Sequence, residues 1–296
     1  MTTEVETPSG KGAGDENFPV GSWLLPADLR PHVTAFYDFV RAADDIADNG
    51  ALAADDKLAR LDLFEQALKG DHDALARLPK ADNLRQSLAE NGVSDRHALD
   101  VLQAFKQDAF KHRYEGWSDL LGYCALSASP VGRFLLDLHG ESRDLYRLSD
   151  PLCDALQVLN HLQDCREDFL ELDRVYLPLD SFAAAGIDVD EVGRPMASPA
   201  MRSVLDRALD GADDLLRRAA DLPRHMKSRR LAAETAVILE MAATLAARLR
   251  RSDPLATRVT LSRPRFALAA LVGIGRLRWL WPGGSHHRPI GSGASR

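Results

Sequence analysis

The chain has 296 residues, of which 45% are hydrophobic, and its formal net charge is −7. This length suffices for one large domain with a sizeable core, and the acidic balance argues against a nucleic-acid-binding surface over the whole chain. Three cysteines without paired spacing, and an acidic N-terminus without an apolar signal segment, predict a cytoplasmic protein.

The hydrophobic pattern predicts helix after helix. Apolar residues recur at intervals of three and four, and strictly alternating runs of β-branched residues are absent. We expect helices near residues 28–49, 55–69, 82–91, 94–113, 117–126, 130–148, 150–171, 199–220, 226–251 and 264–280. Glycines and prolines mark the breaks between them. The sequence therefore predicts one all-α domain over residues 15–282, between polar, disordered tails at 1–14 and 283–296.

The longest predicted connection between helices runs from Leu177 to Pro199. Mobile segments beside active sites often act as lids. A surface excursion without a role is an equally good interpretation of this segment, so the sequence leaves both open.

Two Asp-x-x-x-Asp boxes stand out, Asp44–Asp48 and Asp164–Asp168, and each lies in an apolar helical pattern. A spacing of four places both carboxylates of a box on one helix face, about one turn apart. Acidic residues in such helices are costly to bury unless they are paired or bound to metal. Two such faces turned toward each other would present four carboxylates to Mg²⁺, which proteins usually hold together with substrate phosphates.

The same spacing also occurs in a segment where a functional role is not expected. Asp206, Asp210 and Asp214 repeat it, but polar residues dominate the exposed face predicted for their helix. A single box is therefore weak evidence, because most are solvated helix faces. The pair of boxes in apolar surroundings is what favours a site.

Four segments around and between the boxes resemble one protein family. They are residues 15–31, 36–49, 123–140 and 157–178. In them the chain resembles the squalene/phytoene synthases, the helical head-to-head prenyl synthases, and the similarity extends from Gly14 to about Trp281. The resemblance implies a single-domain class I isoprenoid (prenyl) synthase fold, an all-α bundle around a central cavity.

The resemblance also implies a role for the boxes and their flanks. Two or three Mg²⁺ ions would neutralise a departing diphosphate while its C–O bond ionises. The implied catalytic residues are Asp44, Asp48, Asp164 and Asp168. The implied metal ligands are these four aspartates and Asn160. The implied substrate-binding residues are Tyr37, Arg41, Gln157, Asn160, Arg174 and Tyr176.

Some of these residues have plainer interpretations. Arg41 has the spacing for an intrahelical ion pair with Asp44 or Asp45. Packing at a helix end is a plausible role for Tyr176. Gln157 is spaced to share a helix face with Asn160, so we expect it to point into the cavity.

Departures from the wider family favour one of its branches. They are Asn17–Phe18 near the N-terminus, Ala125, and Gln163 just before the second box. They resemble the hopanoid-pathway branch, which implies that presqualene diphosphate and water give hydroxysqualene and diphosphate. The alternatives are condensation of two farnesyl diphosphates to presqualene diphosphate or squalene, and a non-catalytic helical binding protein.

The pathway partners implied are a presqualene diphosphate synthase and a reductase. Because no Gly-rich strand-to-helix fingerprint is present, we expect no nicotinamide cofactor.

The C-terminal end differs in charge from the rest of the chain. Residues 217–296 hold 16 Lys/Arg against 4 Asp/Glu, a balance of +12. Within residues 264–282, Trp279 and Trp281 alternate with basic residues, a pattern typical of a membrane–water interface. We expect either peripheral contact with the inner face of the cell membrane or a final core helix with an aromatic end.

Overall fold

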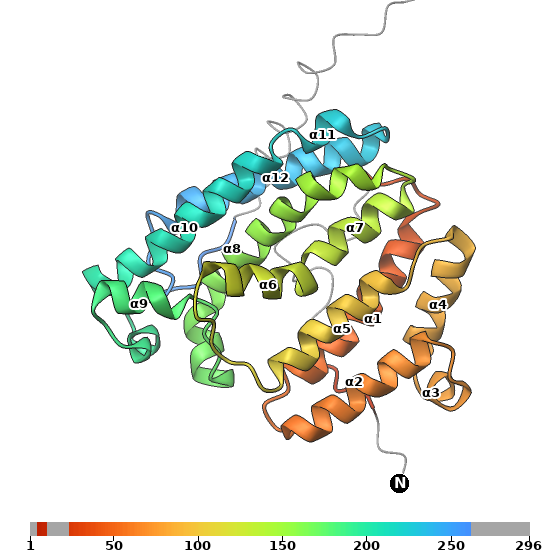
Figure 1. Cartoon of the computed structure of the whole chain (residues 1–296), viewed down its shortest axis with the longest axis horizontal. Helices are drawn as coiled ribbons and strands as arrows, with labels where there is room; N and C mark the ends of the chain where they lie inside the picture. Colours follow the sequence, from red (N-terminus) through yellow and green to blue (C-terminus); the bar gives the residue numbers. More distant parts are fainter. Residues whose placement is uncertain (1–4, 11–23, 262–296) are drawn as a thin grey trace, which may run out of the picture.

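The computed structural model describes residues 5–10 and 24–261, and the regular elements of this part are helices (Figure 1). In chain order they are α1 (Arg30–Ala47), α2 (Ala54–Leu68), α3 (His72–Arg77), α4 (Pro79–Asn91), α5 (Arg96–Asp108), α6 (Trp117–Ser127), α7 (Ser129–Leu138), the 3₁₀ helix η1 (Arg143–Leu145), α8 (Tyr146–Leu172), α9 (Leu179–Ala185), the 3₁₀ helix η2 (Val189–Gly193), α10 (Pro199–Ala219), α11 (Leu222–His225) and α12 (Arg229–Leu249). The predicted all-α class is confirmed.

The helices pack in two groups that share one continuous core (Figure 1). In the first group, α1 packs against α2, α4 and α5. In the second, the long helix α8 packs against α6, α7, α10 and α12, while α5 contacts α6 and α7 and so joins the groups. Aromatic contacts reinforce both the first group and the junction: Phe39 meets Phe64 edge-on at 5.4 Å, and Phe36 of α1 stacks on Phe134 of α7 at 4.0 Å between ring centroids. The two helices that carry the aspartate boxes therefore belong to different groups.

One predicted helix break is wrong. Pro151 was expected to separate two helices, but α8 continues through it. The missing N–H of a proline removes one backbone hydrogen bond, and burial of the apolar face that includes Leu152, Leu159 and Leu162 outweighs that loss. The helix expected near 130–148 ends at Leu138 instead, and the break expected at Gly140 follows it, where a φ of 65° is a left-handed conformation that glycine adopts without strain.

The segment from Leu177 to Pro199 is not a structureless connection. It contains α9 and η2, and α9 packs against α10 while η2 packs against α8. Phe182 and Val192 are buried at 3% and 0% exposure. The segment is therefore anchored to the body of the protein, and its suggested role as a lid stays a prediction.

Part of the predicted N-terminal tail is held against α1. Val5 is buried in the core, the Thr7 hydroxyl donates to the Asp45 carbonyl, and Ser9 donates to both oxygens of the Asp45 carboxylate at 2.7 and 3.1 Å. Composition alone predicted disorder for residues 1–14. For residues 5–10 that prediction is wrong, because one buried side chain and a charge-assisted pair of hydrogen bonds fix the segment.

The C-terminal predictions fall outside the described residues. These are the helix near 264–280, the membrane contact through 264–282 and the tail at 283–296. Within residues 5–10 and 24–261, no helix combines the length and apolar character needed to cross a bilayer.

Candidate active site

Both aspartate boxes lie toward the C-terminal ends of their helices. Asp44 is in the last turn of α1 and Asp48 caps that helix, while Asp164 and Asp168 occupy the last turns of α8. The helix dipole makes this end favourable for cations and unfavourable for carboxylates, yet neither helix has a basic residue in its last turn. Each box therefore needs positive charge supplied from elsewhere.

The two boxes act on one another electrostatically. The pKa of Asp168 is raised to about 8, first by burial, then by the negative charges of Asp164 and Asp48. The pKa of Asp44 is also raised well above its usual range, first by burial and then by Asp48. Since the charge of Asp48 on α1 affects Asp168 on α8, the boxes face a common region.

Arg174 links the end of α1 to the turn that follows α8. Its guanidinium donates to Asp48 Oδ1 at 2.5 Å and to the Ala47 carbonyl at 2.7 Å, and only 4% of the residue is exposed. Asp173 makes this possible, because its φ of 52° reverses the chain directly after α8. In this conformation Arg174 neutralises Asp48, and its contact with a diphosphate remains a prediction.

Lys57 of α2 supplies a second cation at the same helix end. Its buried ammonium group donates to the Ala47 carbonyl at 2.8 Å. Ala47 O therefore receives both Lys57 and Arg174, which satisfies a carbonyl that a helix end leaves unpaired.

Arg41 forms the intrahelical ion pairs that its spacing permits. Its guanidinium lies 2.9 Å from Asp44 and 2.6 Å from Asp45, and it also donates to the Ser9 hydroxyl. Tyr37 lies half-buried one turn earlier on α1. Both residues are on the helix that carries the first box, and their contact with a diphosphate remains a prediction.

The second box forms an ion pair with a residue that no sequence pattern predicted. Arg258, nine residues after the end of α12, holds both oxygens of Asp164 at 2.7 and 3.0 Å. The neighbouring residue Val259 accepts a hydrogen bond from Gln163. Gln157 and Asn160 lie half-buried on the preceding turns of α8, at the spacing that continues the face of Asp164.

Tyr176 belongs to a buried cluster that extends beyond the predicted residues. Its hydroxyl donates to Asp108 at 3.4 Å, and its ring stacks on His161 with centroids 3.6 Å apart. Burial raises the pKa of Asp108 to about 7, and the nearby guanidinium of Arg174 limits the rise. Tyr176 therefore does more than pack at a helix end. Sequence patterns gave no signal for Asp108, which is 68 residues away from Tyr176 in the chain.

The donor set fits a divalent cation. Mg²⁺ prefers carboxylate and amide oxygens, and the carboxylates crowd one another at two helix ends that favour positive charge. Among the residues described here, however, no three His, Cys, Asp or Glu side chains are grouped around one point. Arg258 holds both oxygens of Asp164, whereas Arg174 holds only one oxygen of Asp48, so a metal ion would compete mainly with Arg258.

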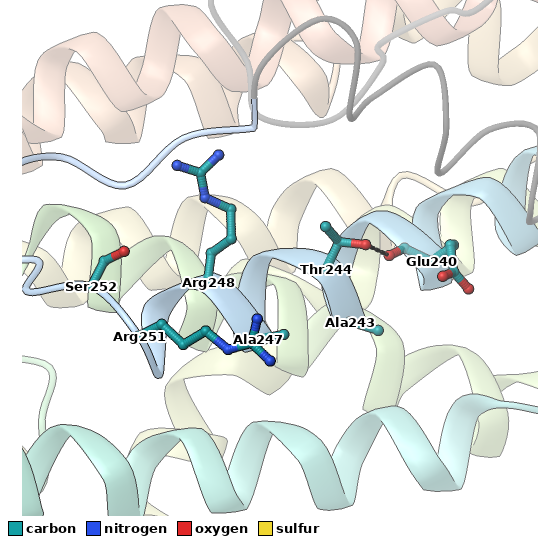
Figure 2. A pocket seen from close by; sticks show the side chains of 7 residues that line it. All are labelled: Glu240, Ala243, Thr244, Ala247, Arg248, Arg251 and Ser252. Atoms are coloured by element: carbon teal, nitrogen blue, oxygen red, sulfur yellow. Dashed lines mark hydrogen bonds between the residues drawn. The ribbon is translucent and has the colours of Figure 1, made fainter.

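A separate pocket of about 500 Å³ lies along one face of α12 and the residues just after it (Figure 2). Its lining residues are Glu240, Ala243, Thr244, Ala247, Arg248, Arg251 and Ser252. None of them was a predicted site residue. The side chains drawn there do not belong to either aspartate box.

Comparison with known proteins identifies the family. A squalene/phytoene synthase profile matches residues 12–265, so the chain belongs to this family. The fold, the paired boxes and the family thus define a prenyl synthase, as the segments around the boxes predict.

Individual relatives indicate which branch of the family the chain resembles. The chain is 45% identical to a hydroxysqualene synthase of Rhodopseudomonas palustris over 91% of each chain, and 46% identical to one of Sinorhizobium fredii over 84% of each. Its fold matches the crystal structure of a squalene synthase from Alicyclobacillus acidocaldarius with a TM-score of 0.70 and 32% identity, covering 78% of this chain and 87% of that one. These matches agree with the predicted branch of the family.

Proposed function

We propose that this protein is a hydroxysqualene synthase, which ionises presqualene diphosphate in the presence of Mg²⁺ and captures the carbocation with water. The products are hydroxysqualene and diphosphate. Support comes from the two hydroxysqualene synthases that share 45% and 46% of its residues over most of their length.

The observation that carries this proposal is the arrangement of the boxes. Two pairs of aspartates lie at two helix C-termini and influence one another's ionisation. Asp44, Asp48, Asn160, Asp164 and Asp168 would hold two or three Mg²⁺ ions, which supply positive charge to the leaving diphosphate. The protein's own carboxylates could not face a diphosphate without such ions, because like charges repel.

The remaining residues of the site bind and orient the substrate. Arg41 and Arg174 would donate to diphosphate oxygens, a task that suits the planar, multiple donors of a guanidinium. Tyr37 and Gln157 would add uncharged hydrogen-bond donors around it, while Tyr176, whose hydroxyl donates to Asp108, would line the site beside them. The buried aromatic rings of Phe36 and Phe134 stack on one another, and such rings beside the substrate would favour a carbocation and limit its reaction with stray water.

One alternative reaction uses the same machinery. Condensation of two farnesyl diphosphates to presqualene diphosphate or squalene is favoured by the similarity to the squalene synthase structure. Intact boxes and similarity to enzymes argue against the non-catalytic alternative.

A presqualene diphosphate synthase would supply the substrate and a reductase would consume the product. We place the protein in the cytoplasm, with residues 264–282 at the inner membrane face where such lipids reside.

Product analysis tests the proposal. The purified protein is incubated with Mg²⁺ and either presqualene diphosphate or farnesyl diphosphate, without nicotinamide, and the products are identified by mass spectrometry. We expect hydroxysqualene from presqualene diphosphate and no reaction of farnesyl diphosphate. Formation of presqualene diphosphate or squalene from farnesyl diphosphate would assign the alternative reaction.

A further inference from the structure

A buried carboxyl group beside the two boxes has no part in the function proposed above. Asp108, the last residue of α5, is only 3% exposed. It accepts the hydroxyl of Tyr123, on α6, at 2.7 Å and that of Tyr176 at 3.4 Å. Both donors are neutral, and burying a carboxylate is costly even when it is hydrogen-bonded. Packing alone does not explain a carboxyl group that is buried with two neutral donors.

The hydrogen bonds fix which way the phenols face. A phenol hydroxyl has one hydrogen to donate. Tyr123 and Tyr176 each donate it to Asp108 and keep oxygen lone pairs that can accept a hydrogen bond from another donor. The rings cannot turn freely, because Tyr114 lies 5.6 Å from Tyr176 and 5.5 Å from Tyr123 between centroids. Each phenol oxygen therefore keeps a lone pair with which it can accept a further hydrogen bond.

The cluster of Asp108, Tyr123 and Tyr176 adjoins the region that the boxes face. The charges of Asp48 and Asp168 contribute to raising the pKa of Tyr176, after burial and Asp108. His161 stacks on Tyr176, and its buried Nε2 has no hydrogen-bond partner within the described parts of the chain. The cluster thus contains acceptor oxygens and an unsatisfied ring nitrogen close to where a diphosphate would leave, a polar environment that suits a water molecule.

We propose that Asp108 is a positioning residue for the water that captures the carbocation: it holds Tyr123 and Tyr176 as acceptors for this water and takes up the proton released on capture. This inference rests on the proposed hydroxysqualene synthase function. It extends that function by naming the groups that deliver the water.

The capture step balances without any further reactant. The water oxygen forms a bond to the cationic carbon, and one water O–H bond breaks. That proton passes to a phenol oxygen while the phenol's own proton passes to Asp108, so the products are the alcohol and a neutral Asp108 carboxyl group. A pKa near 7 suits a group that accepts a proton in one step and loses it to solvent in the next.

Asp108→Asn tests the inference, because asparagine keeps an acceptor oxygen but cannot take up the proton. With presqualene diphosphate and Mg²⁺, released diphosphate and hydroxysqualene are measured in the same reaction. We expect diphosphate release within about threefold of the parent, while the share of released diphosphate that appears as hydroxysqualene falls by about tenfold or more. Other products of the cation make up the difference. An unchanged share of hydroxysqualene would overturn the inference.

Asp137 offers a matched control. Its carboxylate, on α7, accepts the hydroxyl of Tyr146 at 2.6 Å, at the opposite end of α8 from the boxes. Asp137→Asn should leave the hydroxysqualene share unchanged, and a fall equal to that of Asp108→Asn would overturn the specific role of Asp108.

Two further variants keep the test decisive if Asp108→Asn does not fold. Asp108→Glu, which retains a carboxylate, should restore the hydroxysqualene share, whereas Tyr123→Phe should lower it. The opposite pattern would overturn the inference. If the parent itself makes no hydroxysqualene, the proposed function fails rather than the assignment of Asp108 alone.

Discussion

At the scale of single residues, the site is defined by charges placed where the backbone disfavours them. Asp44, Asp48, Asp164 and Asp168 lie at helix ends that repel carboxylates, and Arg174 and Arg258 compensate part of that charge. Such an arrangement contributes little to stability in itself. The arrangement is explained if metal ions, which carry more charge than a guanidinium, bind to these carboxylates during the reaction.

Asp48→Asn and Asp168→Asn each remove one carboxylate from one box. We expect each substitution to lower the rate of diphosphate release by about 100-fold or more, because the affinity of a metal site depends strongly on every ligand. Steady-state release of diphosphate gives the rate, and circular dichroism checks the helical fold. Asp214→Asn is the matched control, since Asp214 repeats the same spacing on the exposed face of α10. Near-parental activity in both box variants would contradict the metal site.

Arg258 competes with any ion that approaches Asp164. Removing the guanidinium in Arg258→Gln takes away one competitor for that carboxylate, so we expect Mn²⁺ without substrate to bind more tightly than to the parent. Isothermal titration calorimetry measures the affinity. Equal or weaker binding in a folded variant would show that the Arg258–Asp164 pair does not oppose metal.

The sequence could predict the boxes and their near neighbours, but not the residues that reach them from elsewhere. Asp44, Arg41 and Tyr37 are related by helix periodicity, which is legible in a sequence. Asp108 and Arg258 reach their partners only through the tertiary fold, across 68 and 94 residues. No local pattern encodes such contacts.

At the scale of helices, close approach depends on particular small residues. A Cβ atom added to Gly211 of α10 would lie 2.4 Å from two ring atoms of Trp117, on α6. Glycine inside a helix ordinarily lowers stability relative to alanine. Its presence here is explained by the space that the indole ring requires.

Gly211→Ala should therefore destabilise the protein despite the better helix propensity of alanine. We expect the free energy of unfolding to fall by about 1–3 kcal/mol from overpacking, measured by urea denaturation. Gly122→Ala in α6 is the control, because its Cβ would meet no atom within 4 Å. That variant should be neutral or slightly stabilised. A stabilised Gly211→Ala would show that Trp117 moves aside at little cost.

The contact of α7 with α8 contains a carboxyl group whose ionisation weakens it. Burial raises the pKa of Asp154 to about 6, and Ser129 donates to it at 2.8 Å. In the unfolded chain this carboxyl ionises near its ordinary pKa of 3.8, so the folded state binds more protons between about pH 4 and 6. Its contribution to stability is present below pH 4 and is lost as pH rises through 6.

Asp154→Asn removes this titration. We expect the variant to gain thermal stability relative to the parent at pH 7.5 and to gain much less at pH 4.5, as measured by calorimetry at both values. An equal difference at the two pH values would contradict the raised pKa. Turnover should be unaffected, because Asp154 lies outside the proposed site.

Helix periodicity predicted the long elements well and the short ones poorly. The helices near 28–49 and 199–220 correspond to α1 and α10 within two residues at each end. The six-residue α3 and the seven-residue α9 were missed, because so few turns do not establish a period. Pro151 misled for the opposite reason, since a strong local signal was outweighed by tertiary packing.

At the scale of the whole molecule, the fold brings together two helices from different parts of the chain. α1 belongs to the group with α2, α4 and α5, while α8 anchors α6, α7, α10 and α12 (Figure 1). Arg174 joins the ends of the two box-bearing helices directly. The account therefore predicts that metal and diphosphate bind between the two groups and hold them together.

The most direct test of this central claim is anomalous diffraction from crystals grown with Mn²⁺ and inorganic diphosphate. We predict Mn²⁺ peaks between Asp44 or Asp48 on one side and Asp164 or Asp168 on the other, with the Arg258–Asp164 ion pair broken. Ordered Mn²⁺ that is bound elsewhere, while both boxes keep their arginine partners, would contradict the account.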